Sequence, residues 1–376
     1  MLGLGGLSRA TVGRSSWQRF SARFDWPLFV VILAIAGIGL LNLYSALSGT
    51  KHEALFTRQI VWMVAGLFVY VVMTVVDYRF WQRFASIALG VAIGLVILVF
   101  LVGLSVKGAQ RWIGFGIVSV QPSEIAKIAV ILALAKLVQD NESGALPDPI
   151  LFGRIAALFL PALGVLLQPD LGSASLIVLI IVSVGYFAVR ELWKINAAVM
   201  SVIALLPVFW ERMEPYQRDR VLCFLDPSAD PTGVCWHTQQ SIMAVGAGRL
   251  TGEGYMNGTQ NQFKFLPEHW TDFPFSVFAE EWGLLGCLFL IGLFAFLTLW
   301  ILNAAMHARD QFGAVVCLGV AALIFWHTIV NIAMVLGLAP VVGVTLPLVS
   351  YGGSSVLTIF VALGLVSSVS SRRHGF

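Results

Sequence analysis

Long apolar runs, interrupted only by short polar or Gly/Pro-containing links, dominate the sequence. Ten such runs lie near residues 26–47, 59–76, 84–105, 121–138, 150–167, 171–189, 193–210, 273–302, 312–337 and 347–369. A helix needs about 20 apolar residues to cross the hydrocarbon core of a bilayer. Because lipid offers no hydrogen-bond partners and the runs lack the alternation of barrel strands, each run is expected to be helical. The sequence therefore predicts an all-α polytopic membrane protein with about ten transmembrane helices.

Composition excludes other broad classes of protein. Hydrophobic residues make up 58% of the 376 residues and charged residues only 11%, whereas soluble domains carry about 25% charged residues. So few charges fit neither a soluble surface nor a disordered or nucleic-acid-binding chain. Four cysteines without a C-x-x-C pair exclude a disulfide-rich scaffold. The first apolar run is longer than a signal-peptide core of about 7–15 residues, so it is expected to be retained.

Lysine and arginine residues predict the orientation. If the N-terminus is cytoplasmic, the short cytoplasmic segments hold 13 of these residues and the short outer segments hold 4. Both termini are therefore expected in the cytoplasm, where such residues concentrate. The chain is expected to comprise a cytoplasmic segment 1–25, a single transmembrane domain 26–370 and a cytoplasmic tail 371–376. One large extracytoplasmic loop, 211–272, joins the seventh and eighth helices.

This loop contains five glycines between residues 246 and 258. A phosphate-binding loop is excluded, because no strand precedes them and no G-K-[ST] follows. A flexible linker and a folded platform remain as alternatives, and apolar side chains between residues 263 and 270 favour the platform. Cys223 and Cys235 lie in the same loop, where an oxidising outer compartment favours a disulfide.

Charged residues at membrane depth are functional candidates, because burying a charge in lipid is expensive. The first group starts the predicted fourth helix, in Gln121-Pro122-Ser123-Glu124-Ile125-Ala126-Lys127. Glu124 and Lys127 are three residues apart and share one helix face. They form either a substrate-binding pair or an ion pair that only makes the helix insertable, and we favour substrate contact.

Two further groups lie in short outer loops. Asp170, within Gln168-Pro169-Asp170-Leu171-Gly172, either caps the following helix through its carboxylate or contacts a ligand. Lys107 and Arg111 stand beside Trp112. These three residues either anchor the protein at the headgroup level or bind a phosphate-bearing lipid headgroup.

The fourth group ends the long loop, where Asp272 precedes Phe273 and Phe275 at the water–lipid boundary. Apolar neighbours favour the protonated form of a carboxylate, which suits a general base. The alternative is a cap on the eighth helix, since Asp is a preferred N-cap residue. Glu280 and Glu281 follow deeper in the same run. The four groups together indicate an outer-facing site for an anionic or sugar-bearing lipid.

Six segments, in order along the chain, resemble motifs of the SEDS (shape, elongation, division and sporulation) family of peptidoglycan glycosyltransferases. They are Lys107-Gly108-Ala109 with Arg111-Trp112, Gln121 to Lys127, Gln168 to Gly172, Leu266-Pro267-Glu268 with Thr271-Asp272-Phe273, Ala279-Glu280-Glu281 with Gly283, and Pro347 to Ser355. Gly258-Thr259-Gln260 and Ala279 resemble the elongation (RodA-type) branch more than the septal (FtsW-type) branch. The family usually has a His directly before the Thr-Asp, where this chain has Trp270, so His269 is assigned no catalytic role.

The resemblance implies a multi-pass protein of the bacterial cytoplasmic (inner) membrane. It implies polymerisation of lipid II into β-1,4 glycan strands during cell elongation and shape maintenance, on the extracytoplasmic side. Asp272 is the expected catalytic base. Substrate binding is expected of Glu124, Lys127, Lys107, Arg111, Trp112, Gln121, Asp170, Glu268, Lys264 and Ser350. No metal ligand is assigned, although the chemistry allows a divalent cation (Mg²⁺ or Mn²⁺) at the pyrophosphate.

The implied partners are lipid II, undecaprenyl pyrophosphate, a class B penicillin-binding protein that supplies the transpeptidase, and other elongation-complex proteins. No nucleic acid is expected. The alternatives are the septal member of the family and a lipid II flippase, because transporters also place charges near the midplane. Against the flippase, the sequence shows no convincing internal repeat, and its polar residues gather on the outer side.

Overall fold

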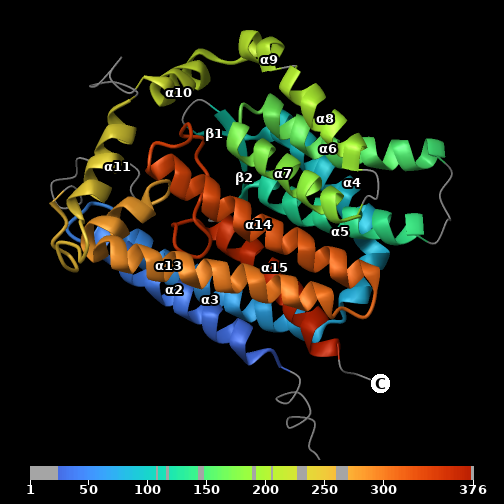
Figure 1. Ribbon diagram of the computed structural model, residues 1–376, viewed down its shortest axis with the longest axis horizontal. Coiled ribbons are helices and arrows are strands. Elements are labelled where there is room, and N and C mark those ends of the chain that lie inside the picture. Colours follow the sequence, from blue (N-terminus) through green and yellow to red (C-terminus); the bar gives the residue numbers. More distant parts are fainter. Residues whose placement is uncertain are drawn as a thin grey trace, which may run out of the picture.

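The computed structural model describes residues 24–106, 109–115, 118–142, 148–188, 192–204, 206–226, 235–259 and 270–373. Its helices pack side by side into a bundle, with a small sheet at one end (Figure 1). The elements are α2 (Trp26–Leu47), α3 (Ala54–Val75), α4 (Tyr78–Val102), β1 (Leu104–Val106), β2 (Ala109–Phe115), β3 (Val118–Val120), α5 (Pro122–Glu142), α6 (Asp148–Leu167), α7 (Leu171–Ala188), α8 (Leu192–Ala204), α9 (Leu206–Arg212), α10 (Pro215–Leu225), α11 (Trp236–Ala247), α13 (Pro274–Met306), α14 (Gln311–Val335) and α15 (Gly353–Arg372).

Eight of the described helices are long and apolar enough to cross a membrane, namely α2, α3, α4, α6, α7, α13, α14 and α15. Two predicted spans are not among them. The span 121–138 corresponds to α5, which has the length but carries charged residues. The span 193–210 is divided between α8 and α9, and the 13 residues of α8 extend only about 20 Å. The helical membrane fold is therefore confirmed, whereas the count of ten stays a prediction.

Helices α14 and α15 form the centre of the bundle. α14 packs against α5, α7 and α13, and α15 packs against α3. Within the protein, 67% of the apolar stretch of α14 is buried, compared with 22% for α3. Polar side chains on α14 are therefore enclosed by other helices rather than by lipid.

One end of the bundle, which we call the loop end, carries the sheet, α10 and α11 (Figure 1). The strands form an antiparallel meander in the order β1-β2-β3 between α4 and α5, a departure from the all-α prediction. The described part of the long loop contains the helices α10 and α11 and a turn segment packed on α13, which agrees with a folded platform rather than a flexible linker. A disulfide joins Cys223 in α10 to Cys235, the N-cap residue of α11, with their Cα atoms 5.2 Å apart.

The glycine-rich segment of the long loop is docked on a bend in α13. The bend lies at Gly283, whose φ of 63° and ψ of −166° interrupt the helix and suit glycine. Here the Leu284 N–H donates to the Arg249 carbonyl at 2.9 Å, and the Glu253 N–H donates to the Glu280 carbonyl at 2.9 Å. The glycines therefore allow close backbone contact between the platform and α13.

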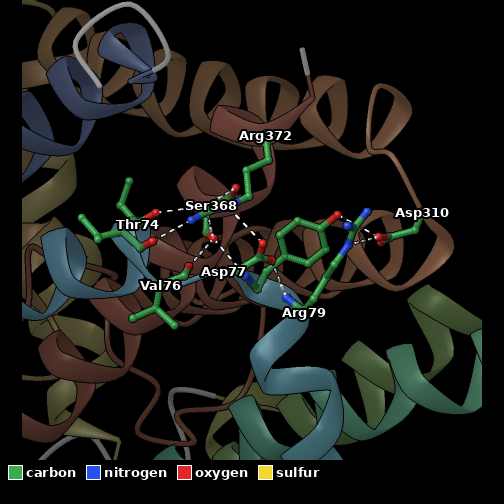
Figure 2. Close-up of polar contacts among 9 residues, drawn as sticks. Thr74, Val76, Asp77, Arg79, Asp310, Ser368 and Arg372 are labelled. Carbon is green, nitrogen blue, oxygen red and sulfur yellow. Dashed lines mark hydrogen bonds and ion pairs between the residues drawn. The ribbon is translucent and has the colours of Figure 1, made fainter. Parts of the chain in front are cut away.

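The opposite end, which we call the terminal end, is where α2 begins and α15 ends. Arg372 of α15 reaches across it (Figure 2). Its Nη1 donates to the carbonyls of Thr74 and Ser368 and to the Ser368 hydroxyl, and its Nη2 donates to the Val75 carbonyl. Its Nε lies 3.5 Å from the Asp77 carboxylate. Arg372 therefore satisfies the last carbonyls of α3 and fixes α15 to that helix.

Asp310 plays a similar part beside it (Figure 2). One carboxylate oxygen accepts the Gly313 N–H at 2.8 Å and caps α14, while the other accepts from the Tyr78 hydroxyl at 2.8 Å and from Arg79 at 3.0 Å. We refer to Arg372, Asp77, Asp310, Arg79 and Tyr78 as the terminal cluster. These charges hold the ends of α3, α4, α14 and α15 together.

Candidate functional site

Asp272 lies at the loop end, immediately before α13, and its side chain is half-buried. Phe273 and Phe275, which follow it, are each only 2% exposed. The N-cap position of α13 is Phe273, so Asp272 stands one residue before the position that the cap alternative required. A Cβ added to Gly343 would lie 3.7 Å from Asp272 Oδ2. The segment around Gly343 therefore borders the carboxylate.

Two buried residues of α14 hold this arrangement, and neither was predicted. The Asn331 Nδ2 donates to the Asp272 carbonyl at 3.0 Å and to the Val344 carbonyl at 2.7 Å. One turn earlier, His327 Nδ1 lies 3.0 Å from the Thr345 carbonyl. A carbonyl only accepts, so Nδ1 carries the proton and Nε2 is left as an acceptor. α14 thus ties Asp272 to the segment that borders its carboxylate.

The Nε2 of His327 faces the predicted charge pair of α5. Lys127 Nζ lies 2.9 Å from His327 Nε2 and 2.8 Å from Glu124 Oε1. Lys127 is 1% exposed and Glu124 5%. The second oxygen, Glu124 Oε2, is buried and has no hydrogen-bond partner among the described residues. Buried polar atoms are nearly always paired, so this oxygen retains acceptor capacity for a ligand.

Asp170 takes the structural role that was one of its two predicted alternatives. Its Oδ1 accepts the Ser173 N–H at 3.1 Å and caps α7, and its Oδ2 lies 3.4 Å from Gln121 Nε2. A Cβ added to Gly172 would lie 2.5 Å from the Val342 carbonyl, so this glycine permits close approach of the 340–344 segment. The two predicted motifs therefore meet beside the segment that borders Asp272.

Arg111 extends from β2 towards α10. Its Nη2 donates to the Pro169 carbonyl and to the Tyr216 hydroxyl, and that hydroxyl donates to the same carbonyl at 2.7 Å. One turn along α10, Arg220 Nη1 donates to the Val341 carbonyl at 3.0 Å. These residues line a small pocket. No sequence pattern pointed to Arg220, which stands among several charged residues of a polar loop.

The remaining predicted residues are distributed differently. The Ser350 hydroxyl is buried and accepts the Leu346 N–H at 2.7 Å, so it shapes the loop before α15. Trp112 is half-buried in β2, opposite Leu104. Lys107, Lys264 and Glu268 lie outside the described residues.

Tyr351, in the Pro347 to Ser355 motif, adds a neutral donor to this end of the molecule. Its N–H donates to the Trp270 carbonyl at 2.8 Å. Burial raises the pKa of Tyr351, and Arg58 opposes that shift. The phenol therefore stays protonated at neutral pH.

The described residues contain no group of three or more His, Cys, Asp or Glu side chains that could hold a metal ion. Mg²⁺ is usually held by one or two carboxylates together with substrate phosphates. Of the candidate carboxylates, Glu124 is paired with Lys127 and Asp170 caps α7. These two side chains are therefore already occupied by the protein, and the divalent cation at the pyrophosphate stays a prediction.

Comparisons with known proteins show the family of the chain. Residues 25–375 match the family model described as "Cell cycle protein", which is named for FtsW, RodA and SpoVE. The chain belongs to this family. It is 39% identical over 362 residues to the peptidoglycan glycosyltransferase MrdB of Escherichia coli K12, with 96% of each chain covered.

Two solved structures are similar over nearly the whole chain. One is described as "Structural coordination of polymerization and crosslinking by a peptidoglycan synthase complex". It has a TM-score of 0.79 and 31% identity, covering 94% of this chain and 99% of the other. The other is the rod shape determining protein RodA of Thermus thermophilus, with a TM-score of 0.70 and 27% identity, covering 94% and 98%. The resemblance seen in the six sequence motifs is thereby confirmed.

Proposed function

We propose that this chain polymerises lipid II into β-1,4 glycan strands, with Asp272 as the catalytic base. The protein is a peptidoglycan glycosyltransferase, and its relatives favour the RodA type over the FtsW type. The observation that carries the proposal is the placement of Asp272. Its half-buried carboxylate lies at the loop end. Asn331 of α14 binds its backbone carbonyl, and His327 of the same helix contacts Lys127.

The chemistry needs one base and one region of positive charge. The 4-hydroxyl oxygen of the acceptor GlcNAc forms a bond to the anomeric carbon of the donor, and its proton passes to the Asp272 carboxylate. The bond from that carbon to the pyrophosphate oxygen breaks, and its electron pair leaves with the pyrophosphate. A single in-line displacement converts the α-linked donor into a β-linked product. Since pyrophosphate leaves as a stable anion, preorganised cations suffice and no protonating acid is required.

Lys127 and Arg111 are the described cations placed for this purpose. Glu124 and His327 hold the Lys127 ammonium at 2.8 and 2.9 Å, and the fold holds Arg111 through Pro169 and Tyr216. Fixed donors in a site that excludes water stabilise developing charge without reorganising. These residues therefore complement the base.

The loop end is proposed to face the extracytoplasmic side of the bacterial inner membrane. The terminal end carries Arg79, Arg372 and Arg373. Because Lys and Arg concentrate on the cytoplasmic side of membrane proteins, the terminal end is expected in the cytoplasm. A transpeptidase of the class B penicillin-binding type is the proposed partner. One of the similar structures is that of a peptidoglycan synthase complex with coordinated polymerization and crosslinking, which supports this partner.

Polymerisation by the purified protein tests the proposal. Wild-type protein incubated with lipid II, with and without an added transpeptidase, should produce glycan strands, and Asp272→Asn should reduce the rate by about 10²–10⁴-fold. Asn preserves the size of the side chain but cannot take a proton. Transfer of labelled lipid II across vesicle membranes without any polymer would instead identify a flippase and overturn the proposal.

A further inference from the structure

We propose that the pocket between β2, α10 and the segment 340–342 binds the pyrophosphate of the lipid-linked donor. This inference rests on the proposed function and assigns its leaving group to a site. The pocket, which we call the arginine pocket, is lined by Arg111, Pro169, Leu171, Tyr216, Gln217, Arg220, Val221, Pro340, Val341 and Val342. A neighbouring cavity of about 220 Å³ shares three of these residues, Tyr216, Arg220 and Val341.

The charge of the arginine pocket points to an anion. Arg111 and Arg220 both line it, and none of the described residues that line it is Asp or Glu. Two carboxylates stand next to lining residues in the sequence. Asp170 is engaged with Ser173 and Gln121, and Asp219 is exposed on α10 and does not line the pocket. Two guanidinium groups without a neutralising acid match a phosphate-bearing ligand, because their planar forks bind phosphate oxygens in pairs.

Both guanidinium groups have unused donors. A guanidinium has five N–H donors. In Arg111 only Nη2 is bonded to the protein, and its Nε is buried with no hydrogen-bond partner among the described residues. In Arg220 only Nη1 is bonded, to the Val341 carbonyl. Because buried N–H groups are nearly always paired, the Arg111 Nε points to a ligand.

The walls of the pocket are fixed by the protein itself. The Tyr216 hydroxyl bonds to Arg111 and to the Pro169 carbonyl, and the Tyr216 ring lies 5.8 Å from the Arg220 guanidinium carbon. The Cys223–Cys235 disulfide joins α10 to α11. An anion would therefore meet donors that are already oriented, which lowers the entropic cost of binding.

A short chain segment also links the pocket to the catalytic region. Val341 and Val342 line it, Gly343 borders the Asp272 carboxylate, and Val344 shares the Asn331 amide with the Asp272 carbonyl. One short segment thus joins the proposed leaving-group site to the proposed base. When the bond to the anomeric carbon breaks, the electron pair passes to the pyrophosphate oxygen, where the unused N–H donors stabilise the new charge.

Direct binding to purified full-length protein in nanodiscs tests the assignment, with undecaprenyl pyrophosphate and phosphatidylglycerol as separate probes. Arg220→Gln should weaken undecaprenyl pyrophosphate binding by about 10- to 100-fold, as expected for a lost charge-assisted contact. Arg212→Gln is the control for the loss of one positive charge. Arg212 is exposed in the last turn of α9 and does not line the pocket. This control should leave the affinity within about twofold.

Two further arms separate the possible outcomes. Asp272→Asn should bind undecaprenyl pyrophosphate as tightly as wild type, so binding is measured independently of whether Asp272 is the base. Arg111→Gln should also weaken undecaprenyl pyrophosphate binding, because Arg111 lies on the opposite wall of the pocket. If thermal unfolding shows that Arg220→Gln does not fold, the Arg111→Gln variant provides the test instead. Unchanged affinity in both arginine variants would overturn the assignment. Equal loss for phosphatidylglycerol would also overturn it and identify a general phospholipid site.

Discussion

Arg372 at the terminal end uses all three guanidinium nitrogens on the protein, whereas Arg111 at the loop end uses only Nη2. The carboxylates differ in the same way. Both oxygens of Asp310 are bonded, while Glu124 Oε2 is buried without a hydrogen-bond partner among the described residues. Charged groups that the chain satisfies fully hold helices together. Charged groups with hydrogen-bond donors or acceptors that the protein leaves unused mark the place where a ligand is expected to bind.

The largest stability effect is expected at the Glu124–Lys127 pair. Glu124→Gln should destabilise the protein by about 3–5 kcal/mol, because it leaves the Lys127 charge buried without its counter-ion. Adding Lys127→Met should restore much of that stability. If the pair also serves the substrate, the double variant folds but makes no glycan from lipid II. Thermal unfolding and polymerisation should be measured on the same preparations, and recovered polymerisation in the double variant would contradict the substrate role.

A smaller effect is expected from the platform disulfide. Replacing Cys223 and Cys235 with Ser should cost about 3 kcal/mol of local stability, because the bond restricts the unfolded chain between them. The expected readout is faster proteolysis between α10 and α11 with the transmembrane helices intact. Thiol labelling of the native wild type provides the control, since Cys287 and Cys317 are buried. Two readily labelled thiols at positions 223 and 235 would contradict the bridge.

The terminal cluster should show a stability effect without a catalytic one. Arg372→Gln should lower the free energy of unfolding by about 1.5–3 kcal/mol, as expected for hydrogen bonds to a charged group. Arg79→Gln makes the same charge change at a side chain that is 51% exposed, and should cost about 0–1 kcal/mol. Folded protein of either variant should polymerise lipid II at close to the wild-type rate. A large loss of rate in Arg372→Gln with unchanged thermal stability would place function at this end as well.

The sequence predicted the parts of this molecule that depend on local pattern. Apolar runs predicted the main helices, and the position of Asp170 before a helix correctly suggested a cap. The sequence does not predict the bend at Gly283, because the apolar run 273–302 indicates one regular span. Its cause is a contact with the 248–254 segment, about 30 residues earlier in the chain, which helical periodicity does not report.

The candidate site was predicted only in part for the same reason. His327 and Asn331 stand in an otherwise apolar run, four residues apart and on one helix face. That pattern could have marked them as buried polar residues in a membrane span. Their partners, however, lie 200 residues away at Lys127 and 59 away at Asp272. Hydrophobic periodicity does not show which residues meet at such separations. These pairs become visible only in the folded structure, where α14 packs against α5 and α13.

The most direct test compares one Asp→Asn substitution at each end, by measuring glycan made from lipid II per folded molecule. Asp272→Asn removes the proposed base. Asp310→Asn removes the charge that faces Arg79, while its amide oxygen can still cap α14. We predict that Asp272→Asn polymerises about 10²–10⁴-fold more slowly with unchanged thermal stability, whereas Asp310→Asn is less stable but polymerises at close to the wild-type rate. Equal rates in the two variants would contradict the assignment of Asp272 as the base.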